Sequence, residues 1–127
     1  MKPIALITGG SRGIGAATAI CAARQGFAVA VNYTRDVQAA NRVVQQIAAA
    51  GGQAIAVQAD VADEAQILAM YQTIDAQLGP VSALVNNAGV VDVAARVDAM
   101  SAERIRRMFD INVLGTFLCT REALKRM

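Results

Sequence analysis

A glycine-rich turn near the amino terminus is the first segment whose residue types could do chemistry. It reads Thr8-Gly9-Gly10-Ser11-Arg12-Gly13-Ile14-Gly15 and lies between a short apolar run at residues 4–7 and a helical pattern. Gly9, Gly13 and Gly15 permit positive φ angles and a close approach of the backbone, and a helix N-terminus offers free N–H groups to a pyrophosphate. No Lys-Ser or Lys-Thr pair follows, which disfavours a P-loop triphosphatase. We therefore expect a phosphate-binding turn, although an isolated turn of this composition also occurs as a plain loop.

The second segment of interest, Asn32-Tyr33-Thr34-Arg35, follows the apolar run at residues 28–31. At this place an NAD-binding fold carries an acid that holds the ribose 2′-hydroxyl, and an acid there would repel a 2′-phosphate. Residues 32–35 include no carboxylate, whereas Arg12 and Arg35 could attract a phosphate and Asn32 and Thr34 could donate hydrogen bonds to it. We therefore expect NADP(H) to be preferred over NAD(H). The alternative for Arg35 is a solvated residue at the start of a helix.

Two further polar segments follow predicted strands. Asp60, with Val61 after it, could accept a hydrogen bond from an exocyclic amine such as that of adenine, or it could cap a turn. Asn86-Asn87-Ala88-Gly89 lies at the end of the next strand, where open α/β sheets bind ligands. Its small residues let a flat ring lie against the backbone, and its amides can tie neighbouring strand ends together. By itself this segment also fits an ordinary turn.

Asn112 interrupts an apolar helical stripe. Ile105, Met108, Phe109 and Asn112 follow the spacing i, i+3, i+4, i+7, so the amide is expected to be buried and to need partners. A catalytic role and a structural role at a helix bend are both open. The arginines of the same helix, Arg104, Arg106 and Arg107, are expected to form a solvated face.

Short apolar runs alternate with helical patterns along the chain. The runs lie at residues 4–7, 28–31, 54–57 and 83–85, and each is expected to form a buried parallel strand. This alternation predicts an α/β fold with a doubly wound parallel sheet, a Rossmann-like three-layer αβα arrangement in the strand order 3-2-1-4. Leucine-rich repeats have a similar spacing, but their L-x-x-L-x-L consensus is absent.

Apolar side chains at helical spacing indicate which face of each helix is buried. The predicted faces are Ile14, Ala17, Thr18, Cys21 and Ala22 in the first helix, Ala40, Val43, Val44 and Ile47 in the second, and Ile67, Met70, Tyr71, Ile74 and Leu78 in the third. Cys119 is also expected to be a small core residue. The last helix should begin at the N-cap Ser101 and run to Met127, with a break or a bend near residues 112–115.

Composition narrows the classes of function. The 127 residues carry a net charge of +2 and are 55% hydrophobic, which suits one globular domain and a small-molecule ligand better than nucleic acid or a membrane surface. The chain has no histidine, which excludes His general bases and Ser-His-Asp triads, and no metal site is expected. No apolar run is long enough for a membrane span or a signal peptide, so a soluble, cytoplasmic protein is expected.

Taken together, these motifs resemble the short-chain dehydrogenase/reductase family over essentially the whole chain. The family's T-G-x-x-x-G-x-G motif is matched by residues 8–15, its N-N-A-G motif by residues 86–89 and its catalytic Asn by Asn112. The resemblance implies the following contacts with the cofactor: Ser11, Arg12 and Ile14 with the phosphates and ribose, Asn32, Tyr33, Thr34 and Arg35 with the 2′-phosphate, Asp60 and Val61 with adenine, and Asn87, Ala88 and Gly89 with the nicotinamide-side ribose. The pattern looks like the NADP(H)-using members, among them 3-oxoacyl-carrier-protein reductases and glucose dehydrogenases.

The family's other catalytic groups have no counterpart here. Its Ser and its Tyr-x-x-x-Lys are missing, since Tyr33 and Tyr71 are followed four residues later by Val37 and Asp75. The resemblance thus implies that residues 1–127 form the amino-terminal part of a longer domain in which Asn112 holds a water of the proton relay. The function implied is NADP(H)-dependent interconversion of an alcohol and a ketone or aldehyde, with the chain inactive alone. The alternative is a non-catalytic nucleotide-binding or self-associating fragment.

The predicted fourth strand also bears on assembly. At residues 82–86 its outer edge would lack a neighbour, and nothing charged protects it. We therefore expect the isolated chain to be oligomeric or prone to aggregate, and the full-length protein to be a homodimer or homotetramer.

Overall fold

Four parallel strands form the centre of the molecule in this computed structural model, which describes residues 2–90 and 92–127. The strands are β1 (Ile4–Ile7), β2 (Ala28–Tyr33), β3 (Gln53–Gln58) and β4 (Ala83–Val85). They lie in the order β3-β2-β1-β4, as predicted. β2 and β3 each extend beyond the predicted runs because their polar ends, Tyr33 and Gln58, remain paired with each other.

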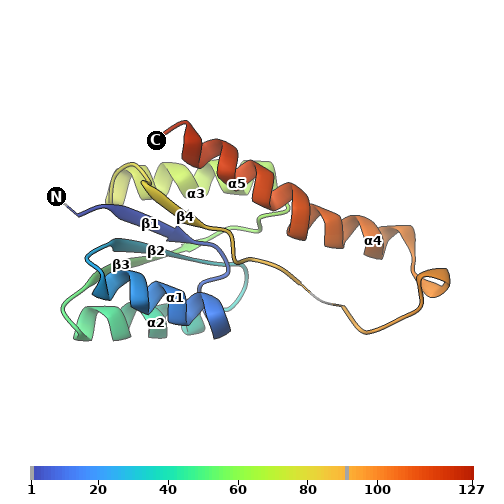
Figure 1. Cartoon of the computed structure of the whole chain (residues 1–127), viewed down its shortest axis with the longest axis horizontal. Helices are drawn as coiled ribbons and strands as arrows, with labels where there is room; N and C mark the ends of the chain where they lie inside the picture. Colours follow the sequence, from blue (N-terminus) through green and yellow to red (C-terminus); the bar gives the residue numbers. More distant parts are fainter. Residues whose placement is uncertain (1, 91) are drawn as a thin grey trace.

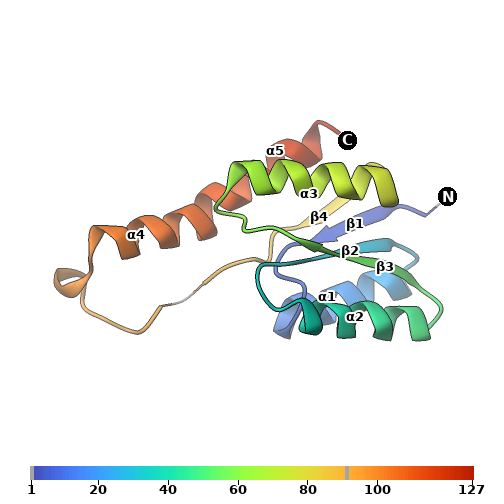
Figure 2. The same cartoon turned by 180° about the vertical axis from the view of Figure 1, so that it is seen from behind.

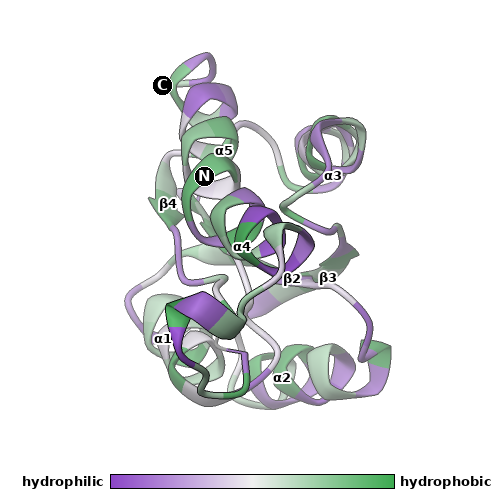
Figure 3. Cartoon of the chain, turned by 90° about the vertical axis from the view of Figure 1, so that its right-hand side faces the viewer, coloured by the Kyte–Doolittle hydropathy of each residue, from purple (hydrophilic) through white to green (hydrophobic). Residues whose placement is uncertain are grey.

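Helices cover both faces of the sheet. The helices are α1 (Gly13–Arg24), α2 (Val37–Ala49), α3 (Glu64–Gln77), α4 (Ala102–Phe109) and α5 (Gly115–Leu124), with a 3₁₀ turn η1 (Val97–Ala99) and a π-helical segment η2 (Asp110–Leu114). Figures 1 and 2 show α1 and α2 on one side of the sheet and α3 and α5 on the other. The end-on view in Figure 3 shows the same three layers. The Rossmann-like αβα arrangement predicted from the alternation is therefore confirmed.

The core has one half on each face of the sheet. Side chains alternate along β1, so that Ile4 and Leu6 join the half under α3 and α5 while Ala5 and Ile7 join the half under α1 and α2. The predicted faces of α2 and α3 are confirmed, with Ile47 and Ile67 among their buried residues.

The predicted face of α1 is wrong. Ile14 is 80% exposed and Cys21 is exposed, whereas Gly15 and Ala19 are buried. Small residues lie on every side of α1, so the pattern of apolar residues did not identify the side that contacts the sheet. A glycine allows the start of α1 to approach the strand ends closely, and this close packing selects the face.

A π-helical segment interrupts the α-helical pattern of the last helix. η2 joins α4 to α5 without a break, one to two residues before the position expected from the sequence. α5 is fixed to α3 by a hydrogen bond from the Tyr71 hydroxyl to the Cys119 carbonyl at 2.7 Å and by an ion pair between Arg126 and Asp75 at 2.8 Å. α4 extends away from the sheet (Figure 1). Within the described residues, no helix combines the length and the apolar character needed to cross a bilayer.

Candidate functional site

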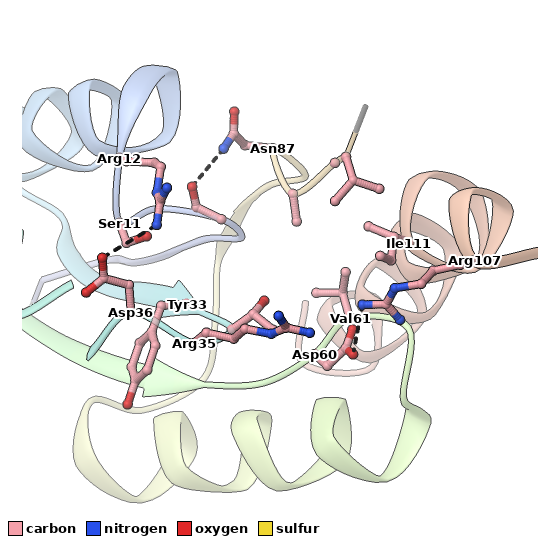
Figure 4. A pocket seen from close by; sticks show the side chains of 15 residues that line it. Ser11, Arg12, Tyr33, Arg35, Asp36, Asp60, Val61, Asn87, Arg107 and Ile111 are labelled. Carbon is pink, nitrogen blue, oxygen red and sulfur yellow. Dashed lines mark hydrogen bonds and ion pairs between the residues drawn. The ribbon is translucent and has the colours of Figure 1, made fainter. Parts of the chain in front are cut away.

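A cavity of about 610 Å³ lies at the carboxyl ends of the strands (Figure 4). Four loops and one helix line it: the turn after β1, the segments that follow β2, β3 and β4, and the α4–η2 helix. Of the predicted site residues, those that line it are Gly9, Ser11, Arg12, Tyr33, Thr34, Arg35, Asp60, Val61, Asn87, Ala88 and Gly89. Residues from four separate parts of the sequence thus share one concave surface.

The glycine turn packs tightly against the loop after β4. Gly9 and Gly13 have φ angles of 60° and 55°, which favour glycine. A Cβ on Gly9 would lie 3.0 Å from the Cα of Ala88, and one on Gly15 would lie 2.5 Å from Nδ2 of Asn87. The glycines therefore bring the start of α1 and the loop after β4 together at the cavity, with the N-terminus of α1 beside it.

Asn87 and Thr8 hold this arrangement. The Asn87 amide donates to the carbonyls of Thr8 at 3.1 Å and Gly9 at 3.0 Å. The Thr8 hydroxyl accepts hydrogen bonds from the backbone N–H groups of Asn87 and Ala88, both at 3.0 Å. The prediction that the amides of this segment tie neighbouring strand ends together is confirmed for Asn87, whereas the Asn86 amide donates to the hydroxyl of Thr120 in α5.

Asn32 does not line the cavity, contrary to what its proposed contact with a 2′-phosphate requires. It is 1% exposed, and its Oδ1 accepts from the N–H of Gly9 at 3.0 Å. Its Nδ2 donates to the carbonyls of Val57 at 3.3 Å and Ala59 at 3.2 Å. Every polar atom of the amide is thus used inside the protein, where it joins the glycine turn to β3.

Arg12, Arg35 and Asp36 lie at the end of the cavity beyond β2. Arg12 pairs with Asp36 at 3.5 Å, and Arg35 lines the same surface. Asp36 also caps α2, since its Oδ1 accepts from the N–H of Ala39 at 3.0 Å. This carboxylate lies one residue beyond the segment 32–35 and was not predicted, although its place directly before a helical pattern is typical of an N-cap.

Asp60 and Val61 form the opposite end of the cavity. Asp60 Oδ1 accepts from the N–H of Ala62 at 2.9 Å, and Asp60 Oδ2 lies 3.8 Å from Nη2 of Arg107. Val61 and Ile111 are nearly inaccessible to solvent and supply an apolar lining. Arg107 is exposed, as expected for a solvated face, and it also reaches the cavity from α4 (Figure 4).

Asn112 is exposed and does not line the cavity, so the expectation of a buried amide is wrong. Its side chain bridges the backbone of Val90, with Oδ1 accepting from the N–H at 2.8 Å and Nδ2 donating to the carbonyl at 3.0 Å. Asn112 therefore positions the segment that leaves Gly89. The remaining predicted site residues, Gly13, Ile14 and Gly15, also lie outside the lining.

The charge of the cavity suits a phosphate-bearing ligand. Three arginines (Arg12, Arg35 and Arg107) against two aspartates (Asp36 and Asp60) leave one excess positive charge on the lining. The glycine turn adds N–H groups at a helix N-terminus. Among the described residues, no group of three or more His, Cys, Asp or Glu side chains could hold a metal ion. The residues thus fit a dinucleotide, with phosphates near the glycine turn.

Comparisons with known proteins agree with this geometry. The family model described as short chain dehydrogenase matches residues 3–127. An uncharacterized oxidoreductase of Escherichia coli is 52% identical over 124 residues, which are 98% of this chain and 50% of that protein. A 3-oxoacyl-[acyl-carrier-protein] reductase of Synechocystis is 42% identical over 98% of this chain and 50% of its own length. The chain therefore spans about half the length of these relatives.

A solved structure shows the same fold. A short chain dehydrogenase from Burkholderia cenocepacia, crystallised in complex with NADP, superposes with a TM-score of 0.93 and 36% identity, over 98% of this chain and 51% of that one.

Proposed function

The chain belongs to the short-chain dehydrogenase family, and we propose that it forms the NADP(H)-binding part of an oxidoreductase that interconverts an alcohol and a ketone or aldehyde. One observation carries this proposal: the cavity at the strand ends combines the glycine turn with the guanidinium groups of Arg12 and Arg35. A bound nicotinamide would supply or accept the hydride. Residues 1–127 are proposed to be one part of a longer dinucleotide-binding domain, inactive on its own.

The two arginines are proposed to select the 2′-phosphate. In the described part of the chain, no carboxylate lies within ion-pair distance of Arg35, so its charge is available to a ligand. Arg12 shares its charge with Asp36. Asp36 in turn could accept a hydrogen bond from a free 2′-hydroxyl, so it opposes the preference that the arginines create. The combined effect of the two arginines and Asp36 is proposed to favour NADP(H) over NAD(H), in line with the NADP bound in the Burkholderia cenocepacia structure.

Asn112 is proposed to act as a positioning residue. By bridging the backbone of Val90 it sets the path of the chain beyond Ala88 and Gly89, which are proposed to contact the nicotinamide-side ribose. Its family role in holding a water of the proton relay remains a prediction for this chain.

Fluorescence titration with NADPH and NADH tests the proposal. The unmodified chain should bind NADPH more tightly, and Arg35→Ala should weaken NADPH binding about ten- to a hundredfold, the worth of a charge-assisted hydrogen bond, with little change for NADH. Asp36→Asn should tighten NADPH binding. Arg42→Ala, on the exposed surface of α2 outside the cavity, is the matched control and should change neither constant. Equal constants in the unmodified chain would contradict the preference, and no binding of either would contradict the function.

Self-association is a second proposal. Phe109, Phe117 and Leu124 are 61%, 71% and 64% exposed along α4 and α5. Large apolar side chains gathered on one helical segment are typical of surfaces that are covered in an assembly. We propose that this segment meets a partner surface in the homodimer or homotetramer of the whole protein.

A further inference from the structure

Arg107 connects two parts of the molecule that are far apart in the sequence. Its side chain leaves α4 and ends 3.8 Å from the carboxylate of Asp60, in the loop after β3. Both side chains are partly open to solvent. An ion pair of this length and exposure contributes little to stability, so a ligand that offers a better contact can displace it.

The surroundings of Arg107 suit a flat base. Val61 and Ile111 provide apolar surface in the same part of the cavity. One oxygen of Asp60 accepts from the N–H of Ala62, and the other is turned toward Arg107. The oxygen that faces Arg107 is the acceptor that an exocyclic amine needs once the weak ion pair opens, and the guanidinium beside it is planar and cationic.

The backbone that carries Arg107 is held firmly against the loop of Asp60. A Cβ on Gly115 would lie only 2.7 Å from the carbonyl oxygen of Val61, so the helix approaches that loop closely. η2, between Arg107 and Gly115, places Ile111 in the lining. The position of the Arg107 backbone relative to Asp60 is thus set by packing, while its long side chain stays free to move.

We propose that Arg107 is a determinant of affinity for the adenine end of the cofactor. Its guanidinium pairs with Asp60 when the cavity holds no nucleotide and lies against the face of the purine when one binds, leaving Asp60 to accept from the amine. Planar cations pack well on aromatic faces, and this contact is expected to stabilise the complex with the nucleotide. The inference rests on the proposed function, since it takes the ligand to be an adenine dinucleotide.

Calorimetric titration of Arg107→Ala with NADPH, NADH and reduced nicotinamide mononucleotide tests the inference. Arg107→Ala should weaken NADPH and NADH by the same factor, about three- to thirtyfold, and leave the mononucleotide unchanged because it lacks adenine. The equal factor separates Arg107 from Arg35, whose removal should affect NADPH alone. Arg106→Ala, one residue away and outside the cavity lining, should change none of the three constants.

Two further variants separate stacking from charge. Arg107→Tyr keeps a flat face without a charge and should retain more NADH affinity than Arg107→Ala, whereas Arg107→Lys keeps the charge without the plane and should retain less than Arg107→Tyr. Full recovery by Arg107→Lys with none by Arg107→Tyr would overturn the inference, and so would an Arg107→Ala variant that binds NADH normally. Unmodified chain that binds neither dinucleotide would instead overturn the proposed function. Equal melting temperatures of the variants would exclude a folding defect.

Discussion

Replacing Asn32 by Asp separates a structural role from a role in cofactor choice. A contact with the 2′-phosphate predicts that Asn32→Asp reverses the preference for NADP(H) in a stable protein. The geometry predicts a loss of stability instead. The new carboxylate keeps the acceptor for the N–H of Gly9 but no longer donates to the carbonyls of Val57 and Ala59, and it places a charge in a site that is 1% exposed.

The cost follows from the lost donors. The carbonyl of Val57 keeps its sheet hydrogen bond from the N–H of Tyr33, whereas the carbonyl of Ala59, just past the end of β3, loses its donor. A buried carbonyl left without a donor costs about 1–3 kcal/mol, and burial of an unpaired charge adds several more. A small domain has about 5–15 kcal/mol of stability in total. The free energy of unfolding should therefore fall by at least about 3 kcal/mol at pH 8. Burial raises the pKa of a carboxyl, so protonation at low pH should make the loss smaller.

Urea unfolding followed by circular dichroism measures this loss. Asn86→Asp is the matched control, because the Asn86 amide is exposed and donates only to the hydroxyl of Thr120 at 3.0 Å, so its loss should stay below about 1 kcal/mol. The reasoning is refuted if Asn32→Asp is as stable as the unmodified chain while its ratio of NADPH to NADH affinity is reversed.

Three other predictions test the packing of the last helices. Gly115→Ala should lower stability by about 1–3 kcal/mol, measured by thermal unfolding, because its Cβ would lie 2.7 Å from the carbonyl oxygen of Val61. Burial raises the pKa of the Cys119 thiol to about 11. The free energy of unfolding should therefore fall between pH 9 and pH 11, where the thiol ionises in the unfolded chain but not in the folded one. Cys119→Ala should reduce this pH dependence, and an unchanged pH dependence would contradict the prediction. Phe117→Arg should shift an associated chain toward monomer in size-exclusion chromatography with light scattering, and a chain that is already monodisperse and monomeric would contradict the exposed-surface argument.

The sheet could be predicted because its signals are local. A buried parallel strand must be apolar on both faces, so β1 is a continuous apolar run and can be recognised without knowledge of its neighbours. The glycine turn and the amide segment could also be recognised, because the positive φ at Gly9 favours glycine and the hydrogen bonds at the strand end require an amide such as that of Asn87.

The errors concern features set by distant contacts. The buried face of α1 depends on how its first turn meets the loop after β4, which the pattern of small residues does not reveal. Asn32 was assigned to a ligand because it ends a strand, yet β3 supplies carbonyls that use its amide. The position of Arg107 beside Asp60 could not be predicted, because nothing near it in the sequence shows that α4 leads back to that loop.

The two ends of the cavity therefore depend on different parts of the chain. The phosphate end is built by β1, α1 and the segment after β2, and its hydrogen bonds do not involve the last helices. The end proposed to bind adenine needs η2 and α4, and these are continuous with α5, which is fixed to α3 by the hydrogen bond from the Tyr71 hydroxyl and by the Arg126–Asp75 ion pair. Loosening α5 should thus weaken binding of adenine while the glycine turn keeps its geometry. A change such as Tyr71→Phe, which removes only the hydroxyl that donates to the Cys119 carbonyl, should reduce affinity for NADPH and NADH by the same factor, as measured by calorimetric titration, because both dinucleotides carry adenine.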